Sequence, residues 1–190
     1  MEVDVRRPGL LDFAAAWDLQ RALAREATPE RGFLLLLEHP PVFTLGRNGN
    51  PANILDPGGI PVLRIDRGGD VTYHGPGQLV GYPILDIRRL GVRRFVKGLE
   101  ASLVDCLAAL GVAAASREKC VGVWTSKGKI ASIGVRVSRG VTTHGFALNV
   151  ANDLAPFARI HPCGVPGDTV TSVSRELGRE VSTAEAVDRF

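Results

Sequence analysis

Apolar residues recur at helical spacing in two stretches of the chain, residues 10–27 and 92–110. Thr28 and Pro29 end the first pattern, and Gly111 follows the second. Side chains four positions apart share one face of a helix, so both stretches are predicted to be amphipathic helices. Ser182, with Glu185 three positions later, forms a capping box that predicts the start of a further helix.

Shorter apolar runs, separated by Gly, Pro and polar residues, predict strands. The last three runs are joined by short Gly-containing turns, which indicates an antiparallel meander. Helices and strands do not alternate strictly, so the pattern favours an α+β fold with a mixed, largely antiparallel sheet and packed helices. The predicted strands are residues 33–37, 42–45, 60–65, 79–87, 121–124, 129–137 and 142–150.

The bulk composition narrows the class of protein. The 190 residues are 45% hydrophobic, which fits one globular domain over residues 1–190. A net charge of +3 is too mild for a nucleic-acid binder and would suit an acidic protein partner. Three cysteines without paired spacing indicate neither disulfides nor a zinc site, so a reducing compartment is favoured. No apolar run approaches the ~20 residues of a membrane span and no signal layout opens the chain, so we expect a cytoplasmic protein.

Three features carry candidate chemistry. The first is the block 67–78, RGGDVTYHGPGQ, whose glycines permit close backbone approach to a ligand. It also holds more hydrogen-bonding side chains than a simple turn requires, which is typical of a binding loop. A long turn with incidental polar residues is the simpler reading. The second is Cys163, between Pro162 and Gly164 in a segment typical of an accessible loop. Cys106 and Cys120 are predicted to be packing residues instead.

The third feature is Lys129, the first residue of a predicted strand. Regular alternation places it on the apolar face with Ala131, opposite Ser132 and Gly134. A desolvated lysine loses its proton more easily and can act as a base. The alternative is a lysine whose ammonium extends from the strand end into water.

These features, in this order, resemble the lipoyl(octanoyl) transferase family. The Arg-Gly-Gly to His-Gly-Pro-Gly-Gln block is highly specific, and a downstream lysine and Pro-Cys-Gly accompany it. The resemblance implies the fold of biotin and lipoate protein ligases. It rests on residues 38–46, 67–78, 129–134, 143–149, 162–164 and 170–172.

The resemblance also implies an activity without a cofactor or a metal ion. Cys163 would take an octanoyl or lipoyl group from acyl carrier protein, and a lysine of a lipoyl domain would then accept it. Lipoyl domains of 2-oxoacid dehydrogenases and the glycine cleavage H-type protein are the implied acceptors. Lys129 would accept protons or stabilise the thiolate. The implied substrate-binding residues are Arg67, Gly68, Gly69, Asp70, Val71, Thr72, Tyr73, His74, Ser132, Ile133, Gly134, Gly145, Phe146 and Ala147.

Other readings stay open at this point. An ATP-dependent lipoate or biotin ligase would share the fold but needs no cysteine. A Cys–His hydrolase would use His74 or His144 as base, although both histidines fit hydrogen bonding in the pocket or a structural role. A non-enzymatic module that binds acyl carrier or lipoyl domains would need no reactive Cys163.

Overall fold

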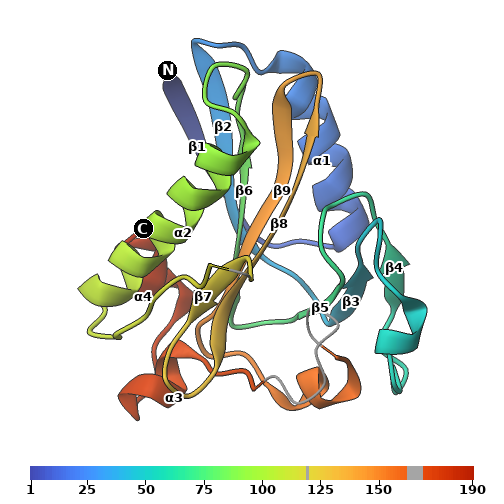
Figure 1. The fold of residues 1–190 in the computed structure, drawn as a ribbon, viewed down its shortest axis with the longest axis vertical. Helices are drawn as coiled ribbons and strands as arrows, with labels where there is room; N and C mark the ends of the chain where they lie inside the picture. The colour runs from blue at the N-terminus through green and yellow to red at the C-terminus, as the bar shows by residue number, and fades with distance from the viewer. Residues whose placement is uncertain (119, 162–168) are drawn as a thin grey trace.

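The computed structural model describes residues 1–118, 120–161 and 169–190 (Figure 1). The helices are α1 (Phe13–Glu26), α2 (Val92–Ala109), α3 (Val173–Leu177) and α4 (Thr183–Val187), with 3₁₀ turns η1 (Pro51–Asn53) and η2 (Ala155–Arg159). The strands are β1 (Glu2–Leu10), β2 (Arg31–Glu38), β3 (Val42–Leu45), β4 (Val62–Arg64), β5 (Val71–His74), β6 (Gln78–Ile84), β7 (Gly122–Trp124), β8 (Lys129–Ser138) and β9 (Val141–Asn149).

Two sheets form the framework. The larger has the order β1-β2-β6-β9-β8-β7, and all its pairs are antiparallel except β1 with β2. The smaller has the order β4-β3-β5, with β4 parallel and β5 antiparallel to β3. The predicted α+β class with a mixed, largely antiparallel sheet is confirmed.

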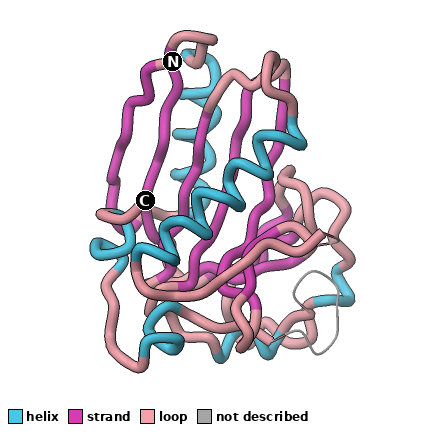
Figure 2. Tube along the Cα trace, turned by 60° about the vertical axis from the view of Figure 1, so that its left-hand side comes forward, coloured by secondary structure: helices cyan, strands magenta, loops and turns pink. Residues whose placement is uncertain are grey.

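The two long helices cover opposite faces of the larger sheet (Figure 2). On one face, Leu103 and Leu107 of α2 pack with Leu148 of β9. On the other face, Ala16 and Leu23 of α1 pack with apolar residues of β2 and β6. Every predicted helix and strand is present, with ends shifted by a few residues. Cys106 is buried on α2 as predicted, and burial raises the pKa of its thiol to about 11.

Two strands and one α-helix of the described residues were not predicted. Strand β1 lies at the edge of the sheet with most of its side chains exposed, so it lacks the apolar run that marks a buried strand. Strand β5 lies inside the Gly-rich block, which its composition marked as a loop, and pairs with β3 from Val71 to His74. Helix α3 is a single short segment, Val173–Leu177, capped by the side chain of Ser172.

Within the described ranges, no helix is long and apolar enough to cross a membrane.

Candidate active site

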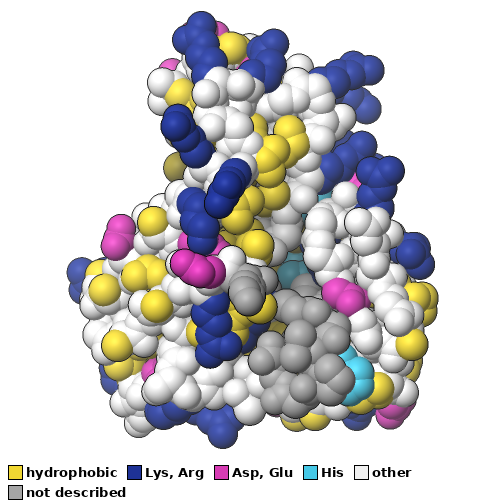
Figure 3. Space-filling view, viewed as in Figure 1, with side chains coloured by type: hydrophobic (Ala, Val, Ile, Leu, Met, Phe, Trp, Pro, Cys, Tyr) yellow, Lys and Arg dark blue, Asp and Glu magenta, His cyan; other side chains and the backbone are white. Residues whose placement is uncertain are grey.

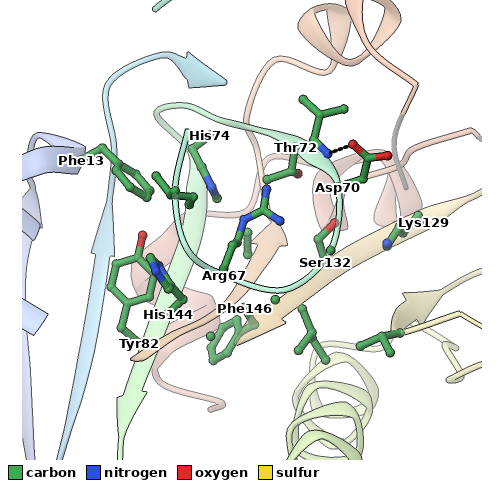
Figure 4. Close-up of a pocket in the computed structure, with 18 of the residues that line it drawn as sticks. Phe13, Arg67, Asp70, Thr72, His74, Tyr82, Lys129, Ser132, His144 and Phe146 are labelled. Carbon is green, nitrogen blue, oxygen red and sulfur yellow. Dashed lines mark hydrogen bonds between the residues drawn. The ribbon is translucent and has the colours of Figure 1, made fainter. Parts of the chain in front are cut away.

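The Gly-rich block links the small sheet to the large one. Arg67 is 8% exposed, and its guanidinium donates hydrogen bonds to the carbonyl oxygen of Thr44 on β3 at 2.7 Å and to its hydroxyl at 3.0 Å. The amide of Gly68 donates to the carbonyl oxygen of Val135 on β8 at 3.0 Å. The block therefore forms an arch over β8 and β9 (Figure 4).

A cavity of about 430 Å³ lies beneath this arch, within the size range of small-molecule sites (~300–1,000 Å³). All the residues proposed from the sequence to bind substrate line it except Gly68 and Tyr73. Its wall is made by Phe13, Ile65, Arg67, Gly69, Asp70, Val71, Thr72, His74, Tyr82, Cys120, Val121, Lys129, Ser132, Ile133, Gly134, His144, Gly145, Phe146 and Ala147.

Gly68 and Tyr73 contribute to the frame of the site instead. Gly68 makes the backbone link to β8, and its carbonyl oxygen accepts a hydrogen bond from Arg67. The ring of Tyr73 lies in a separate apolar cluster, with ring centroids 5.5 Å from Phe43 and 5.6 Å from Phe157. Its neighbours on β5, Thr72 and His74, line the cavity.

Lys129 lines the cavity from the start of β8 and is only 3% exposed. Its ammonium nitrogen lies 5.0 Å from the ring centroid of Trp124, a cation–π contact that stabilises a lysine out of water. The lysine therefore does not extend into solvent, and its burial, as expected from the sequence, is confirmed.

The predicted face of Lys129 is wrong, because the strand is not regular. Trp124 pairs with Lys129 but its neighbour Val123 pairs with Ala131, so Ile130 is an extra residue in β8. An extra residue of this kind, a β-bulge, breaks the alternation of side chains. Ala131 consequently belongs to the core under α2, whereas Lys129 lines the same cavity as Ser132.

Backbone contacts hold Lys129 to a later segment. Its amide donates to the carbonyl oxygen of Thr169 at 2.8 Å, and its carbonyl oxygen accepts from the amide of Thr171 at 3.0 Å. Side-chain hydrogen bonds stabilise the same contact between the two segments. The hydroxyls of Thr125 and Thr171 both donate to one carboxylate oxygen of Glu176, at 2.9 and 2.7 Å. The start of β8 is therefore tied to the segment that begins at Thr169 by both backbone and side-chain hydrogen bonds.

Cys163, the proposed nucleophile, lies outside the described residues. The described chain stops at His161, whose amide donates to the carbonyl oxygen of Asn53 at 2.8 Å, and resumes at Thr169 beside Lys129. Its proposed role stays a prediction.

Two buried histidines, His74 and His144, line one end of the cavity, and a third, His39, packs against His74 behind it. The imidazole of His39 donates to the carbonyl oxygen of Leu11 at 2.6 Å and accepts from the Tyr82 hydroxyl at 2.7 Å. His74 donates to the side-chain oxygen of Gln78 at 2.8 Å. Burial lowers the pKa of His39 to about 4 and holds that of His74 well below its usual range. These rings are neutral at neutral pH and act as fixed hydrogen-bonding groups.

His144 does not share a face of β9 with Phe146 and Leu148, which belong to the core under α2. Its φ angle is +57°, a left-handed conformation that reverses the side chain within the strand. The ring lies 5.9 Å from that of Trp17 on α1, and its Nε2 donates to the carboxylate of Asp66 at 2.8 Å. Burial, together with the positive charges of Arg67 and Arg136, lowers its pKa to about 3.

Sequence reasoning missed several cavity residues. Phe13 and Tyr82 lie in a regular helix and strand, where an aromatic residue is expected to be part of the hydrophobic core. No local sequence motif distinguishes them as site residues. Cys120 was predicted to pack internally, but it is exposed and lines the cavity, because it precedes β7 instead of joining it. Among the described residues, no cluster of three or more His, Cys, Asp or Glu side chains could hold a metal ion.

Comparison with known proteins places this site in a family. Residues 12–190 match the lipoyl protein ligase A/B catalytic domain. The octanoyltransferase of Geobacter sulfurreducens is 55% identical over 180 residues, which cover 93% of this chain and 76% of that protein.

Solved structures support the fold. A lipoate-protein ligase A bound with ATP superposes with a TM-score of 0.84 at 17% identity, covering 100% of this chain and 82% of the other. The biotin protein ligase of Aquifex aeolicus gives 0.55 at 11% identity, covering 100% of this chain and 64% of the other. The fold is thus that of lipoate and biotin protein ligases, as predicted. With this match in sequence and fold, the chain belongs to the lipoyl protein ligase A/B catalytic domain family and, within it, to the octanoyltransferases, which are acyltransferases.

Proposed function

We propose that this chain transfers an octanoyl or lipoyl group from acyl carrier protein to a lysine of a lipoyl domain, through a thioester on Cys163. The observation that carries the proposal is a buried lysine, Lys129, at one end of a largely apolar cavity in a chain 55% identical to an octanoyltransferase. An apolar cavity suits an alkyl chain, and a buried amine at its end suits proton transfer.

The chemistry has two balanced steps. The Cys163 thiolate attacks the carbonyl carbon of the donor thioester, and the carrier's thiol leaves as the acyl-cysteine forms. The amine of the acceptor lysine then attacks that carbonyl, the amide forms, and the Cys163 sulfur leaves. Lys129 takes the proton of the Cys163 thiol and gives it to the departing carrier sulfur. In the second step it takes the proton of the acceptor amine and gives it to the departing Cys163 sulfur. The donor is already activated, so no ATP and no cofactor are needed.

The substrate-binding residues would work largely through backbone. Gly69 of the arch leaves room for the acyl group against the main chain, while Gly68 holds the arch to β8. Ser132 and Gly145 line the cavity on β8 and β9, where the reacting end and the alkyl chain would lie. Tyr73 would support this wall from behind, through its cluster with Phe43.

The test is a comparison of two acyl donors. Purified protein is mixed with octanoyl-acyl carrier protein, or with free octanoate, ATP and magnesium, and a lipoyl domain is followed by intact mass. We expect the octanoyl mass on the lipoyl domain from the first donor alone. Modification that requires ATP and free octanoate would instead identify a ligase.

Omitting the acceptor tests the intermediate. One octanoyl group, removable by hydroxylamine, should remain on the protein, and peptide mapping should place it on Cys163. Cys106 and Cys120 are internal controls, because one is buried and the other lines the cavity. Label on either of them, or no label while transfer proceeds, would refute the Cys163 thioester. A water-labile adduct would indicate a hydrolase.

The proposal also includes the protein partners of the enzyme and its cellular compartment. The lipoyl domains of 2-oxoacid dehydrogenases and the glycine cleavage H-type protein would be acceptors, and one catalytic domain over residues 1–190 would act in the cytoplasm. Carrier and lipoyl domains of acidic composition would meet a net charge of +3. Figure 3 shows Lys and Arg side chains spread over the upper part of one face. Transfer should therefore slow as salt rises.

A further inference from the structure

We propose that the ring of Phe13 sets the length of the acyl chain that this enzyme accepts, as the end wall of its cavity. The inference rests on the proposed function, since it assumes that an acyl chain occupies the cavity with its carbonyl near Lys129.

The cavity has two chemically different ends (Figure 4). Lys129 lies at one end, on β8, and Arg67 lies between the ends beneath the arch. Phe13, Tyr82 and His144 lie together at the other. A chain attached near Lys129 and extended along β8 and β9 would therefore meet this aromatic group with its last carbons.

Phe13 is the central member of that group. It is 3% exposed, and its ring centroid lies 5.0 Å from that of His39, 5.9 Å from His74 and 6.5 Å from His144. The ring is thus packed against planar groups on several sides, which favours one fixed position for it.

The neighbours of Phe13 are themselves fixed. His39 is held between the carbonyl oxygen of Leu11 and the hydroxyl of Tyr82, and His74 is held by Gln78. Asp12, the N-cap of α1, accepts hydrogen bonds from the amides of Ala14 and Ala15 and so fixes the backbone around Phe13. A wall with this support measures length, whereas a wall of loosely held aliphatic side chains would adapt.

The packing around the ring shows what a smaller residue would expose to the cavity. Phe13 packs with Val42 and Ile65 in an apolar cluster of its own, between α1 and the small sheet. Removing the ring would join its volume to the cavity and give added methylene groups an apolar surface. Burying a methylene is worth about 0.8 kcal/mol, so two of them correspond to roughly a 10-fold gain in kcat/KM.

The experiment compares donors that differ only in chain length. Hexanoyl-, octanoyl-, decanoyl- and dodecanoyl-acyl carrier proteins are tested with the parent protein and with Phe13→Ala, Phe13→Leu and Phe13→Trp. We expect Phe13→Ala and Phe13→Leu to raise the decanoyl-to-octanoyl ratio of kcat/KM, by roughly 10-fold for Ala. Phe13→Trp should shift the preference towards hexanoyl. Phe95→Leu, a matched loss of volume in the core under α2, should leave the ratios unchanged.

The outcomes separate the two proposals. If the parent protein transfers no acyl group from any carrier, the proposed function fails. If it transfers octanoyl but the Phe13 variants keep the parent's ratios, the length-setting role of Phe13 is overturned. Should Phe13→Ala fail to fold, the opposite shifts expected of Phe13→Leu and Phe13→Trp decide the question.

Discussion

The backbone amide of His144 donates a hydrogen bond to the side-chain oxygen of Gln20, at 2.6 Å, deep between β9 and α1. Gln20 is fully buried and His144 is 1% exposed. The bond satisfies an amide that the left-handed conformation of His144 turns towards the helix. It thereby helps to hold a residue in a backbone geometry that side chains other than glycine rarely adopt.

The backbone strain at position 144 can be measured by comparing two substitutions. His144→Ala and His144→Gly both remove the ring and its bond to Asp66. Only alanine keeps the penalty of about 1–2 kcal/mol for a left-handed conformation. We therefore expect His144→Gly to be the more stable of the two by about that amount in urea unfolding. Equal stability, or a more stable alanine variant, would show that φ at this position carries no strain.

The stability of the protein should fall in mild acid. The pKa values of His39 and His144 are about 4 and about 3 in the folded protein, against 6.5 in the unfolded chain. Between pH 6.5 and about 4 the unfolded chain therefore binds more protons, and the free energy of unfolding falls by about 1.4 kcal/mol per pH unit for each histidine. This stabilisation is complete above pH 6.5 and is lost as pH falls through 4 and 3.

A pH series of chemical unfolding curves tests this linkage. His39→Gln should flatten the dependence between pH 6 and 4 by about 1.4 kcal/mol per pH unit, the contribution of one histidine. A dependence that His39→Gln leaves unchanged would show that His39 protonates equally in both states.

Lys129 is expected to be required for its loss of a proton, not for its charge alone. Lys129→Ala and Lys129→Arg should each lower kcat by about 10²–10⁴, because a guanidinium stays protonated and alanine has no amine. Circular dichroism should show an intact fold for both. Lys127→Ala changes an exposed lysine two positions earlier, and its kcat should stay near that of the parent protein. Near-normal turnover of Lys129→Arg would limit Lys129 to an electrostatic role.

Gly134 is expected to control how closely the arch approaches β8. A Cβ at this position would lie 2.8 Å from the carbonyl oxygen of Gly68 and 3.0 Å from the side chain of Arg67. Gly134→Ala should therefore push the arch outward, weaken the Gly68–Val135 bond and reduce kcat/KM by at least about 10-fold, since small misplacements at a site are costly.

Gly98 provides the matched control. A Cβ there would meet nothing within 4 Å, and the residue lies in the middle of α2. Gly98→Ala should keep full activity and raise the free energy of unfolding by up to about 1 kcal/mol. If Gly134→Ala also kept full activity, the close approach of arch and strand would have no bearing on transfer.

Much of the fold could be predicted because its signal is local. The amphipathic repeat of α2 and the turns of the β7–β8–β9 meander are visible in the order of apolar residues. Strand β1 could not be found, since it pairs through its backbone at the sheet edge and exposes most side chains. Strand β5 was hidden by the glycines and polar residues on both sides of it.

Site residues that belong to a sequence motif were predicted. Site residues that reach the cavity only through tertiary packing were missed. The Gly-rich block, Lys129 and the β9 segment 145–147 stand out in sequence, and the structure gathers them around one cavity. The extra residue Ile130 left no sequence signal, so regular alternation put Lys129 on the wrong face. Phe13 reaches the cavity only because α1 packs across the larger sheet.

The bonds that join Lys129 to Thr169 and Thr171 also set a limit on the order of folding. The meander that carries Lys129 is made of neighbours in sequence and can form early, whereas its link to the later segment is a long-range contact that forms slowly. On the ribosome, a nascent chain that has not yet exposed residue 171 cannot complete this junction. The growing polypeptide should therefore acquire most of its larger sheet before it acquires a finished reaction centre.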